Sequence, residues 1–331
     1  MNTEDTLRRE RLDALLAESN PRQAGELLVQ HGPIIAAEVP YLTQKAESGS
    51  ATARANAARY LGLARAPEAT VALRALAAKT EDLAVFAFAL GALLDESDAK
   101  TLAAARPELV RKALHHPDPE VAAIGIRAAW LAGLSGVADD LAAKLNSTND
   151  KERQAVLEVL AKAGAGPLEP KLIELLNNPN PQQFTPFSLI YQALCHSDNP
   201  AAGEALRKSL ADGNRDHERD FSNAVFLSKS RKPWLRALLL SLAHSDGSLR
   251  WTALDRLGEW GEPALTRELV QICLTEYEKR LPKERSATRN TDSQLDECDR
   301  YMGTLAGRQF LLDARYDAME FARSWLAAHP G

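Results

Sequence analysis

Cysteine is scarce in this sequence, and the three that occur are Cys195, Cys273 and Cys298. They are far apart in the chain and odd in number, so they form neither a metal-ligand spacing nor a disulfide framework. Such usage favours a reducing compartment. The N-terminal residues are charged and lack the apolar core of a signal peptide, and no apolar stretch is long enough to cross a bilayer. We therefore expect a soluble, cytoplasmic protein with no membrane partner, no metal and no cofactor.

Aromatic residues make up only 6% of the chain, and no run occurs in which Val, Ile or Thr alternates with polar residues. Such a run is the usual sign of a strand, so its absence argues against a sheet. Ala and Leu are abundant, as expected for closely packed helices. A hydrophobic fraction of 45% with 26% charged residues supports a folded chain. The composition predicts an all-α protein.

Familiar catalytic motifs are also missing. The chain has no G-x-x-x-x-G-K-[ST], no G-x-G-x-x-G after a strand, no H-E-x-x-H and no G-x-S-x-G. The pair His115–His116 has no further Cys or His nearby, and Pro117 and Pro119 indicate a turn rather than a metal site. The formal net charge of −5 argues mildly against nonspecific nucleic-acid binding. We assign no catalytic residue, although active sites assemble from distant residues and the question of an enzyme stays open.

The segment 246–274 shows the unit from which the chain is built. Asp246 is placed to cap a helix, and Gly258 and Gly261 allow that helix to end. Pro263 then suits the first turn of a second helix. The apolar residues at helical spacing, which we expect to be buried, are Leu249, Ala253, Leu254, Leu257, Trp260, Leu265, Leu269, Ile272 and Cys273. Each helix has one apolar side, so such a hairpin needs neighbours stacked on both sides.

Weaker copies of this unit recur along the chain. Ser50 and Asn149 occupy the same capping position as Asp246, and Arg54, Arg153 and Arg250 each follow four residues later. Asn149 lies 99 residues after Ser50, and Asp246 lies 97 residues after Asn149. Three units fit each gap at about 32–33 residues, a period typical of solenoids.

The pattern cap–Pro–x–Val–Arg–x–x–Ala–Ala–x–x–Leu–Gly followed by a second helix resembles the HEAT repeat, in the short form shared with phycobilisome-lyase-type repeats. Segments 50–62, 149–161 and 246–258 carry the resemblance best, whereas the segment that opens at Asp118 departs from it after Val121. The resemblance covers about residues 50–275. It implies a right-handed α-α superhelix of about seven helical hairpins. HEAT-like proteins include scaffolds, transport factors, chaperones for pigment attachment and a few DNA glycosylases, so the resemblance does not specify one function.

The repeat sets the expected organisation of the chain. We expect an N-terminal helical cap over 1–49, the repeat solenoid over 50–280, a polar loop over 281–294 and a C-terminal helical cap over 295–331. For the N-terminal part the alternative is an arm that docks a partner. For the C-terminal helix, which has a wide apolar surface, the alternative is an interface with another chain.

Basic and aromatic residues gather between 229 and 260. The candidate binding residues of this patch are Lys229, Arg231, Lys232, Trp234, Arg236, Arg250, Trp251 and Asp255. By resemblance to HEAT-like DNA glycosylases, Trp251, Asp255 and Arg231 would hold a nucleotide. Lys229, Lys232 and Arg236 would then contact phosphates. The simpler interpretation is a solvated basic turn beside a core tryptophan.

A second set of candidates follows from the register of the repeat. If the second helix of each hairpin lines the concave face, the residues near that face are Arg74, Lys171, Glu174, Arg207, Lys208, Arg267 and Glu268. Because a solenoid creates extended surface more readily than a closed pocket, we expect a non-catalytic scaffold or adaptor that binds another protein on the concave face. The alternatives are a DNA glycosylase or nucleic-acid-binding protein that uses the 229–260 patch and, with less support, a bilin-lyase-like chaperone.

Overall fold

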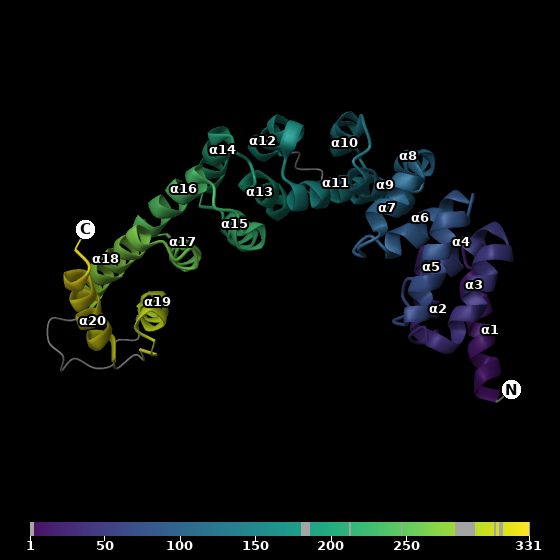
Figure 1. Ribbon diagram of the computed structural model, residues 1–331, viewed down its shortest axis with the longest axis horizontal. Helices are drawn as coiled ribbons and strands as arrows, with labels where there is room; N and C mark the ends of the chain where they lie inside the picture. The colour runs from purple at the N-terminus through teal and green to yellow at the C-terminus, as the bar shows by residue number, and fades with distance from the viewer. Residues whose placement is uncertain are drawn as a thin grey trace. The chain divides into compact units, whose positions relative to one another are not determined.

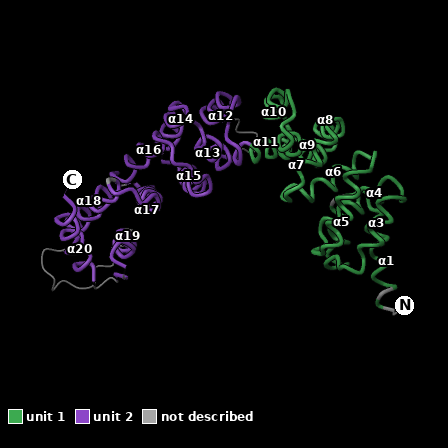
Figure 2. The backbone as a smooth tube through the Cα atoms, in the orientation of Figure 1, with its two compact units in different colours: residues 1–159, 181–184 green, residues 160–180, 185–331 purple. Residues whose placement is uncertain are grey.

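The computed structural model describes residues 3–179, 186–211, 213–245, 247–281, 295–307, 309–310 and 314–330. The regular elements across these ranges are helices, and the ranges contain no strand, which confirms the all-α prediction. The described residues fall into two compact units, one up to Val159 and one from Leu160 onward (Figure 2). Each unit is described by itself below.

Unit 1 contains the first ten helices and the start of the eleventh. These are α1 Thr3–Ala17, α2 Pro21–His31, α3 Val39–Ser48, α4 Ala51–Leu61, α5 Pro67–Lys79, α6 Leu83–Ala92, α7 Ala99–Ala105, α8 Pro107–Leu114, α9 Pro119–Ala132, α10 Val137–Leu145 and α11 Asp150–Ala163. α3 begins at Val39, after a 3₁₀ turn over Ala36–Glu38. Pro40 therefore lies in the first turn, where its missing N–H costs nothing, and does not kink a longer helix.

The boundary between the two units lies within α11, after Val159. The further helices of unit 2 are α12 Glu169–Asn177, α13 Phe187–Cys195, α14 Pro200–Leu210, α15 Arg215–Ser228, α16 Pro233–His244, α17 Arg250–Gly258, α18 Pro263–Arg280, α19 Asp296–Ala306 and α20 Arg315–Ala328. The predicted polar loop over 281–294 lies, apart from Leu281, outside the described residues. None of the helices described in either unit is both long and apolar enough to cross a membrane.

Unit 2 has two layers of helices, which can be followed in Figure 1. In one layer α13 contacts α15, α15 contacts α17, and α17 contacts α19. In the other layer α12, α14, α16, α18 and α20 contact one another in the same order. Each helix therefore packs on the helix two places further along the chain. This is how a helix with one apolar side buries it against both neighbours.

Short polar side chains and prolines define where the helices begin. The Ser50 side chain accepts a hydrogen bond from the Ala53 amide, as the predicted cap of α4 should. Asn149 likewise accepts from the Lys151 amide at the start of α11. Pro263 occupies the first position of α18, as predicted. Asp246 itself lies outside the described residues, but α17 begins only at Arg250, with Leu249 at the N-cap position and no side-chain cap, so the helix does not start directly after Asp246 as predicted.

The arginines that the sequence aligns share one structural role. Arg54 Nη1 donates to the Gly49 carbonyl oxygen at 3.2 Å, and Arg250 Nε donates to the Ala243 carbonyl oxygen at 3.0 Å. Arg153 makes the same kind of bond to the carbonyl of Ser147. In each case the carbonyl ends or follows the preceding helix, whose last carbonyls have no partner within the helix. Each of these arginines therefore joins its own helix to the helix before it.

The first and last described helices each pack within their own unit. The Asn56 side chain of α4 donates to the carbonyl oxygens of Leu15, Leu16 and Glu18, which end α1. At the other end α20 packs against α18 and α19. The apolar residues predicted for 246–274 are buried without exception, and Trp260 is 5% exposed. The expectation that Trp260 belongs to the core is confirmed.

Candidate binding site

Three of the four basic side chains between 229 and 236 are bonded to other segments of the chain. Lys232 Nζ lies 2.5 Å from Asp198 Oδ1, and Arg236 Nη1 lies 3.1 Å from Glu262 Oε2. Arg231 Nη1 donates to the Trp260 carbonyl oxygen at 3.4 Å. Lys229 is exposed and ends α15 in the left-handed conformation, with φ of 51°. Carboxylate partners reduce the charge that this turn offers to a phosphate backbone.

Trp234 links two helices of one layer. Its indole Nε1 donates to the Ser197 carbonyl oxygen at 2.9 Å. The ring lies so close to Gly203 of α14 that a Cβ added there would be 2.6 Å from Trp234 Cε3. The half-buried ring is thus held by packing and by a hydrogen bond, both of which position it between α14 and α16.

The remaining residues of the patch belong to α17, in the other layer. Arg250 is only 5% exposed, although the sequence placed it among surface residues. Its guanidinium carbon lies 5.8 Å from the centroid of the Trp251 ring. Trp251 and Asp255 are half-buried on α17, four residues apart. The structure therefore divides the patch between α16 and α17 and buries one of its cations.

The candidates chosen by register are also engaged locally. Arg74 belongs to unit 1, where its Nε lies 2.7 Å from Asp98. In unit 2, Lys171 pairs with Glu174 at 2.9 Å and Arg207 with Glu204 at 2.7 Å. Arg267 Nη1 donates to the carbonyl oxygens of Leu326 and His329, which end α20, and Glu268 lies 3.1 Å from His244. Lys208 is exposed on α14. Six of these seven residues thus have a polar partner close to them within their own unit.

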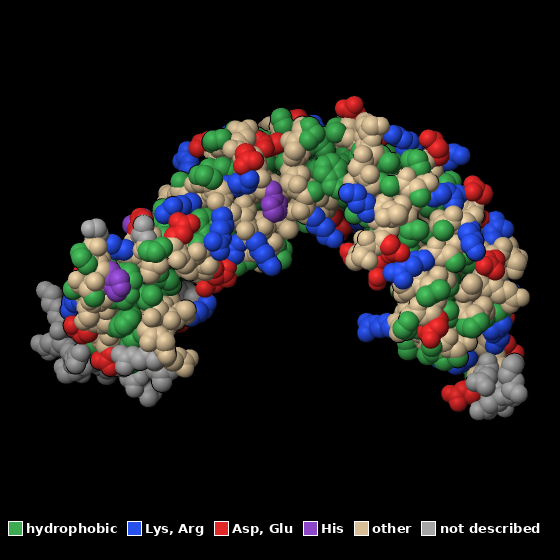
Figure 3. All heavy atoms as spheres, in the orientation of Figure 1, with side chains coloured by type: hydrophobic (Ala, Val, Ile, Leu, Met, Phe, Trp, Pro, Cys, Tyr) green, Lys and Arg blue, Asp and Glu red, His purple; other side chains and the backbone are tan. Residues whose placement is uncertain are grey.

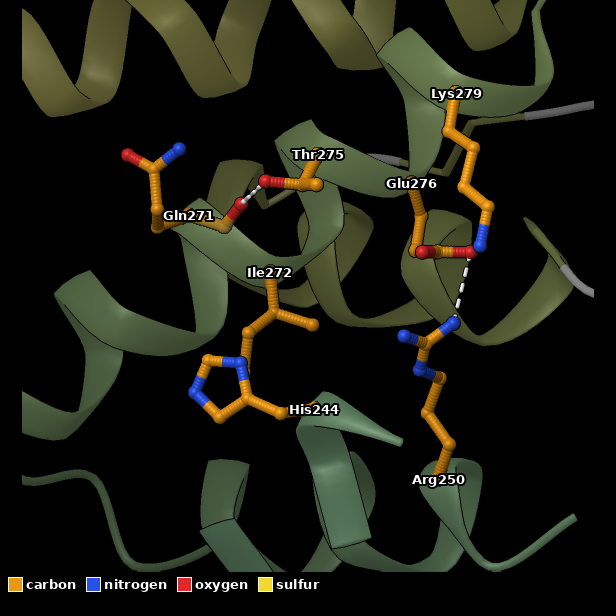
Figure 4. A pocket seen from close by; sticks show the side chains of 7 residues that line it. All are labelled: His244, Arg250, Gln271, Ile272, Thr275, Glu276 and Lys279. Carbon is orange, nitrogen blue, oxygen red and sulfur yellow. Dashed lines mark hydrogen bonds and ion pairs between the residues drawn. The ribbon is translucent and has the colours of Figure 1, made fainter. Parts of the chain in front are cut away.

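Sequence reasoning missed a cavity of about 260 Å³ at the meeting of α16, α17 and α18 (Figure 4). The residues that line it are His244, Arg250, Gln271, Ile272, Thr275, Glu276 and Lys279. His244 ends α16 and Arg250 begins α17. The other five recur along one face of α18. The cavity opens to solvent past Gln271 and Lys279, both of which are exposed.

A buried carboxylate organises the charge in this cavity. Glu276 is 2% exposed, and its Oε2 lies 2.8 Å from Arg250 Nη1 and 2.7 Å from Arg280 Nε. In Figure 4 the ammonium group of Lys279 points toward the same carboxylate. Buried carboxylates need polar partners, and two guanidinium groups supply them here. Arg250 in turn donates to the Ala243 carbonyl oxygen.

A second buried polar cluster joins the last three helices. Arg315, which is fully buried, lies 2.7 Å from Asp299 Oδ2, and Tyr277 donates to Asp299 Oδ1 at 2.9 Å. Burial raises the pKa of the Asp299 carboxyl, against the opposing effect of the hydrogen bonds from Arg315 and Tyr277. These contacts join α18, α19 and α20.

Two cysteine thiols, which are 25 residues apart in the sequence, lie next to each other in the same region. Cys273 and Cys298 are buried and hydrogen-bonded, and this bond, together with burial, raises the pKa of the Cys298 thiol well above its usual value. All three cysteines are free and buried. Among the described residues, no group of three or more His, Cys, Asp or Glu side chains is arranged to hold a metal ion.

Basic and acidic side chains lie interspersed on the visible face of each unit in Figure 3. No protein-family model matches the chain, and no curated protein matches it. Among solved structures, the crystal structure of an engineered protein is similar over 98% of this chain and 92% of its own, with 17% identity and a TM-score of 0.49. A likeness at that level carries no argument about fold or function.

Proposed function

We propose that this chain is a HEAT-like right-handed α-α superhelix that binds a polypeptide partner and catalyses no reaction. Its seven hairpins would begin with α4, α6, α9, α11, α13, α15 and α17. The observation that supports this most is the layer pattern of unit 2, in which every helix packs on the helix two places further along. Stacked layers present long rows of side chains, which suit an extended partner better than a small substrate.

Two further observations favour this proposal. The aligned arginines each bind a carbonyl near the end of the preceding helix, as expected for equivalent positions of a repeat. The partners of Lys232 and Arg236 are carboxylates, so the nucleic-acid alternative has less support than the sequence suggested. Three free thiols suit the cytoplasm.

The proposal is tested by native mass spectrometry of the tagged full chain after gentle extraction from its own cells. We expect a complex of defined stoichiometry with one polypeptide species. That polypeptide is then expressed separately and titrated by calorimetry, because co-purification alone does not establish direct binding. A chain that elutes without any polypeptide, or a candidate that fails to bind when purified, would overturn the proposal.

A further inference from the structure

We propose that an apolar pocket at the end of α2 binds a large apolar side chain of a polypeptide partner, at a position flanked by acidic residues. The pocket has a volume of about 300 Å³ and is lined by Leu28, Val29, Gly32, Pro33, Ile34 and Leu63. We refer to it below as the Val29 pocket. That the partner is a polypeptide rests on the proposed function, whereas the pocket rests on the packing of unit 1.

Exposed apolar side chains gather at the Val29 pocket. Val29 is 84% exposed and Leu63 is 50% exposed, and both line the pocket. Ile35, the next residue after this lining, is 44% exposed. These three are half of the six large apolar side chains that are exposed in the described parts of the chain. Apolar side chains grouped around one depression indicate a contact site, whereas singly scattered ones do not.

The backbone that forms the Val29 pocket is held in place by neighbouring groups. Arg8 Nη2 donates to the Pro33 carbonyl oxygen at 3.1 Å, and the Ile35 amide donates to Glu38 Oε2 at 2.9 Å. Gly32 ends α2 with a φ of 81°, a conformation that favours glycine. The pocket is therefore formed before a partner arrives, and little backbone entropy is lost on binding.

Two cations beside the Val29 pocket are available to a partner. Arg11 Nη1 donates to the carbonyl oxygen of Gln30, the residue after Val29, at 3.1 Å. Arg65 is exposed in the loop after α4, two residues beyond Leu63. Neither guanidinium forms an ion pair with a carboxylate of the described residues. Both can therefore pair with acidic side chains of a partner.

The acidic side chains of the same segments do not cancel this preference. Glu26 pairs with Arg22 at 3.6 Å, and Glu38 pairs with Arg8 at 2.9 Å. Glu68 is exposed in the first turn of α5 and, like the other described carboxylates, forms no ion pair with Arg65. A partner with acidic residues gains ion pairs at Arg11 and Arg65, whereas a basic partner meets repulsion there.

The lining selects the side chain that enters. Its side chains are apolar, so a polar side chain would lose hydrogen bonds to water without replacing them. A volume of about 300 Å³ accommodates Leu, Met or Phe. The geometry thus favours an apolar residue between acidic residues over a basic or a purely polar sequence.

The test uses three blocked peptides as probes of the ¹⁵N-labelled full chain in NMR titrations: N-acetyl-Glu-Leu-Glu amide, N-acetyl-Lys-Leu-Lys amide and N-acetyl-Glu-Ser-Glu amide. We expect saturable shifts with the first peptide at the amides of residues 28–32, 34 and 63–65. The dissociation constant should be in the millimolar range, because one apolar side chain and exposed ion pairs supply little binding free energy. The other two peptides should bind about fivefold more weakly or not at all.

Two substitutions separate the apolar contact from the charges. Val29→Ser should weaken binding of the first peptide by about fivefold or more. The matched control Val71→Ser changes an exposed valine of α5 outside the pocket and should leave binding unchanged. Arg65→Glu should weaken binding of the Glu-Leu-Glu peptide by about threefold and strengthen that of the Lys-Leu-Lys peptide. Both substituted positions are exposed, so the fold should tolerate them.

Four outcomes would overturn the inference. They are no saturable shift with the Glu-Leu-Glu peptide, equal binding of the Lys-Leu-Lys peptide, binding that Val29→Ser leaves unchanged, and self-association through the same amides that Val29→Ser abolishes. The last result would show that a second copy of this chain fills the pocket.

Failure of the inference can be distinguished from failure of the proposed function. If the Glu-Leu-Glu peptide binds but no polypeptide is recovered from the cells, the pocket assignment stands and the scaffold proposal fails. If a polypeptide binds but the peptide does not, only the assignment of the Val29 pocket fails.

Discussion

Arg250 and Glu276 form a buried ion pair at 2.8 Å, with side chains that are 6% and 3% exposed. Breaking such a pair on one side leaves a buried charge with fewer partners. Arg280 still contacts Glu276, so the loss is not complete. We expect Arg250→Ala to lower the free energy of unfolding by about 3 kcal/mol, measured by urea unfolding followed by far-UV circular dichroism.

The exposed pair Arg207–Glu204 is the control, and Arg207→Ala should change stability little. Equal effects of the two substitutions would contradict the structural role of Arg250.

Asn56 offers a test of how α1 is attached. Its amide donates to three carbonyls at the end of α1, and Asn56→Asp keeps the shape but removes both donor hydrogens. We expect a loss of about 1–3 kcal/mol and faster amide hydrogen exchange in α1. Asn223→Asp makes the same change at an exposed site on α15 and should leave both measurements unchanged. Unchanged exchange in α1 for Asn56→Asp would show that the helix is held by other contacts.

Gly203 and Trp234 test the packing of α14 on α16. Gly203→Ala places a methyl group 2.6 Å from the indole ring, which must shift. We expect a loss of about 1–3 kcal/mol together with a change in tryptophan fluorescence. Gly25→Ala in α2 meets nothing within 4 Å and should instead stabilise by roughly 0.5–1 kcal/mol. Two substitutions of the same kind should thus have opposite signs.

Glu152 makes the stability of unit 1 depend on pH. Burial alone would raise its pKa, but hydrogen bonds from Lys144 and Ser147 outweigh that effect and hold the pKa below its usual 4.5. A depressed pKa in the folded state stabilises the protein above the unfolded pKa, and this contribution is lost as pH falls through the folded value. Glu152→Gln should therefore destabilise at neutral pH, with a difference from wild type that shrinks below pH of about 4.5. A difference that is constant from neutral to acidic pH would contradict this origin.

The 229–260 patch can be tested with labelled duplex DNA. Because Lys232 and Arg236 are paired with carboxylates, we expect flat fluorescence anisotropy at moderate salt and only weak binding at low salt. Steep, salt-dependent binding that is lost in Lys232→Glu would show that the patch is a nucleic-acid site after all. It would also restore the alternative function that the sequence suggested.

The helical fold was largely predictable, and particular residues explain why. Caps and prolines act within one helical turn, so local chemistry predicts where such helices begin. The residues that begin helices in this way are Ser50, Asn149, Pro67, Pro233 and Pro263. Burial followed from helical spacing, as Trp260 shows.

The cavity between α16, α17 and α18 was not predictable, because its parts meet only through packing. Arg250 and Glu276 are 26 residues apart on different helices, and nothing local shows that Arg250 is buried. Cys273 and Cys298 meet for the same reason. A clue was present in the alignment of Arg54, Arg153 and Arg250, since an arginine at a fixed position in each repeat indicates a structural task.

The central claim is that this chain binds a polypeptide directly. Calorimetric titration of the purified full chain with the purified polypeptide that co-elutes from its own cells tests this claim most directly. We predict saturable binding at a fixed stoichiometry. Absence of heat and of complex formation at any tested concentration would contradict it.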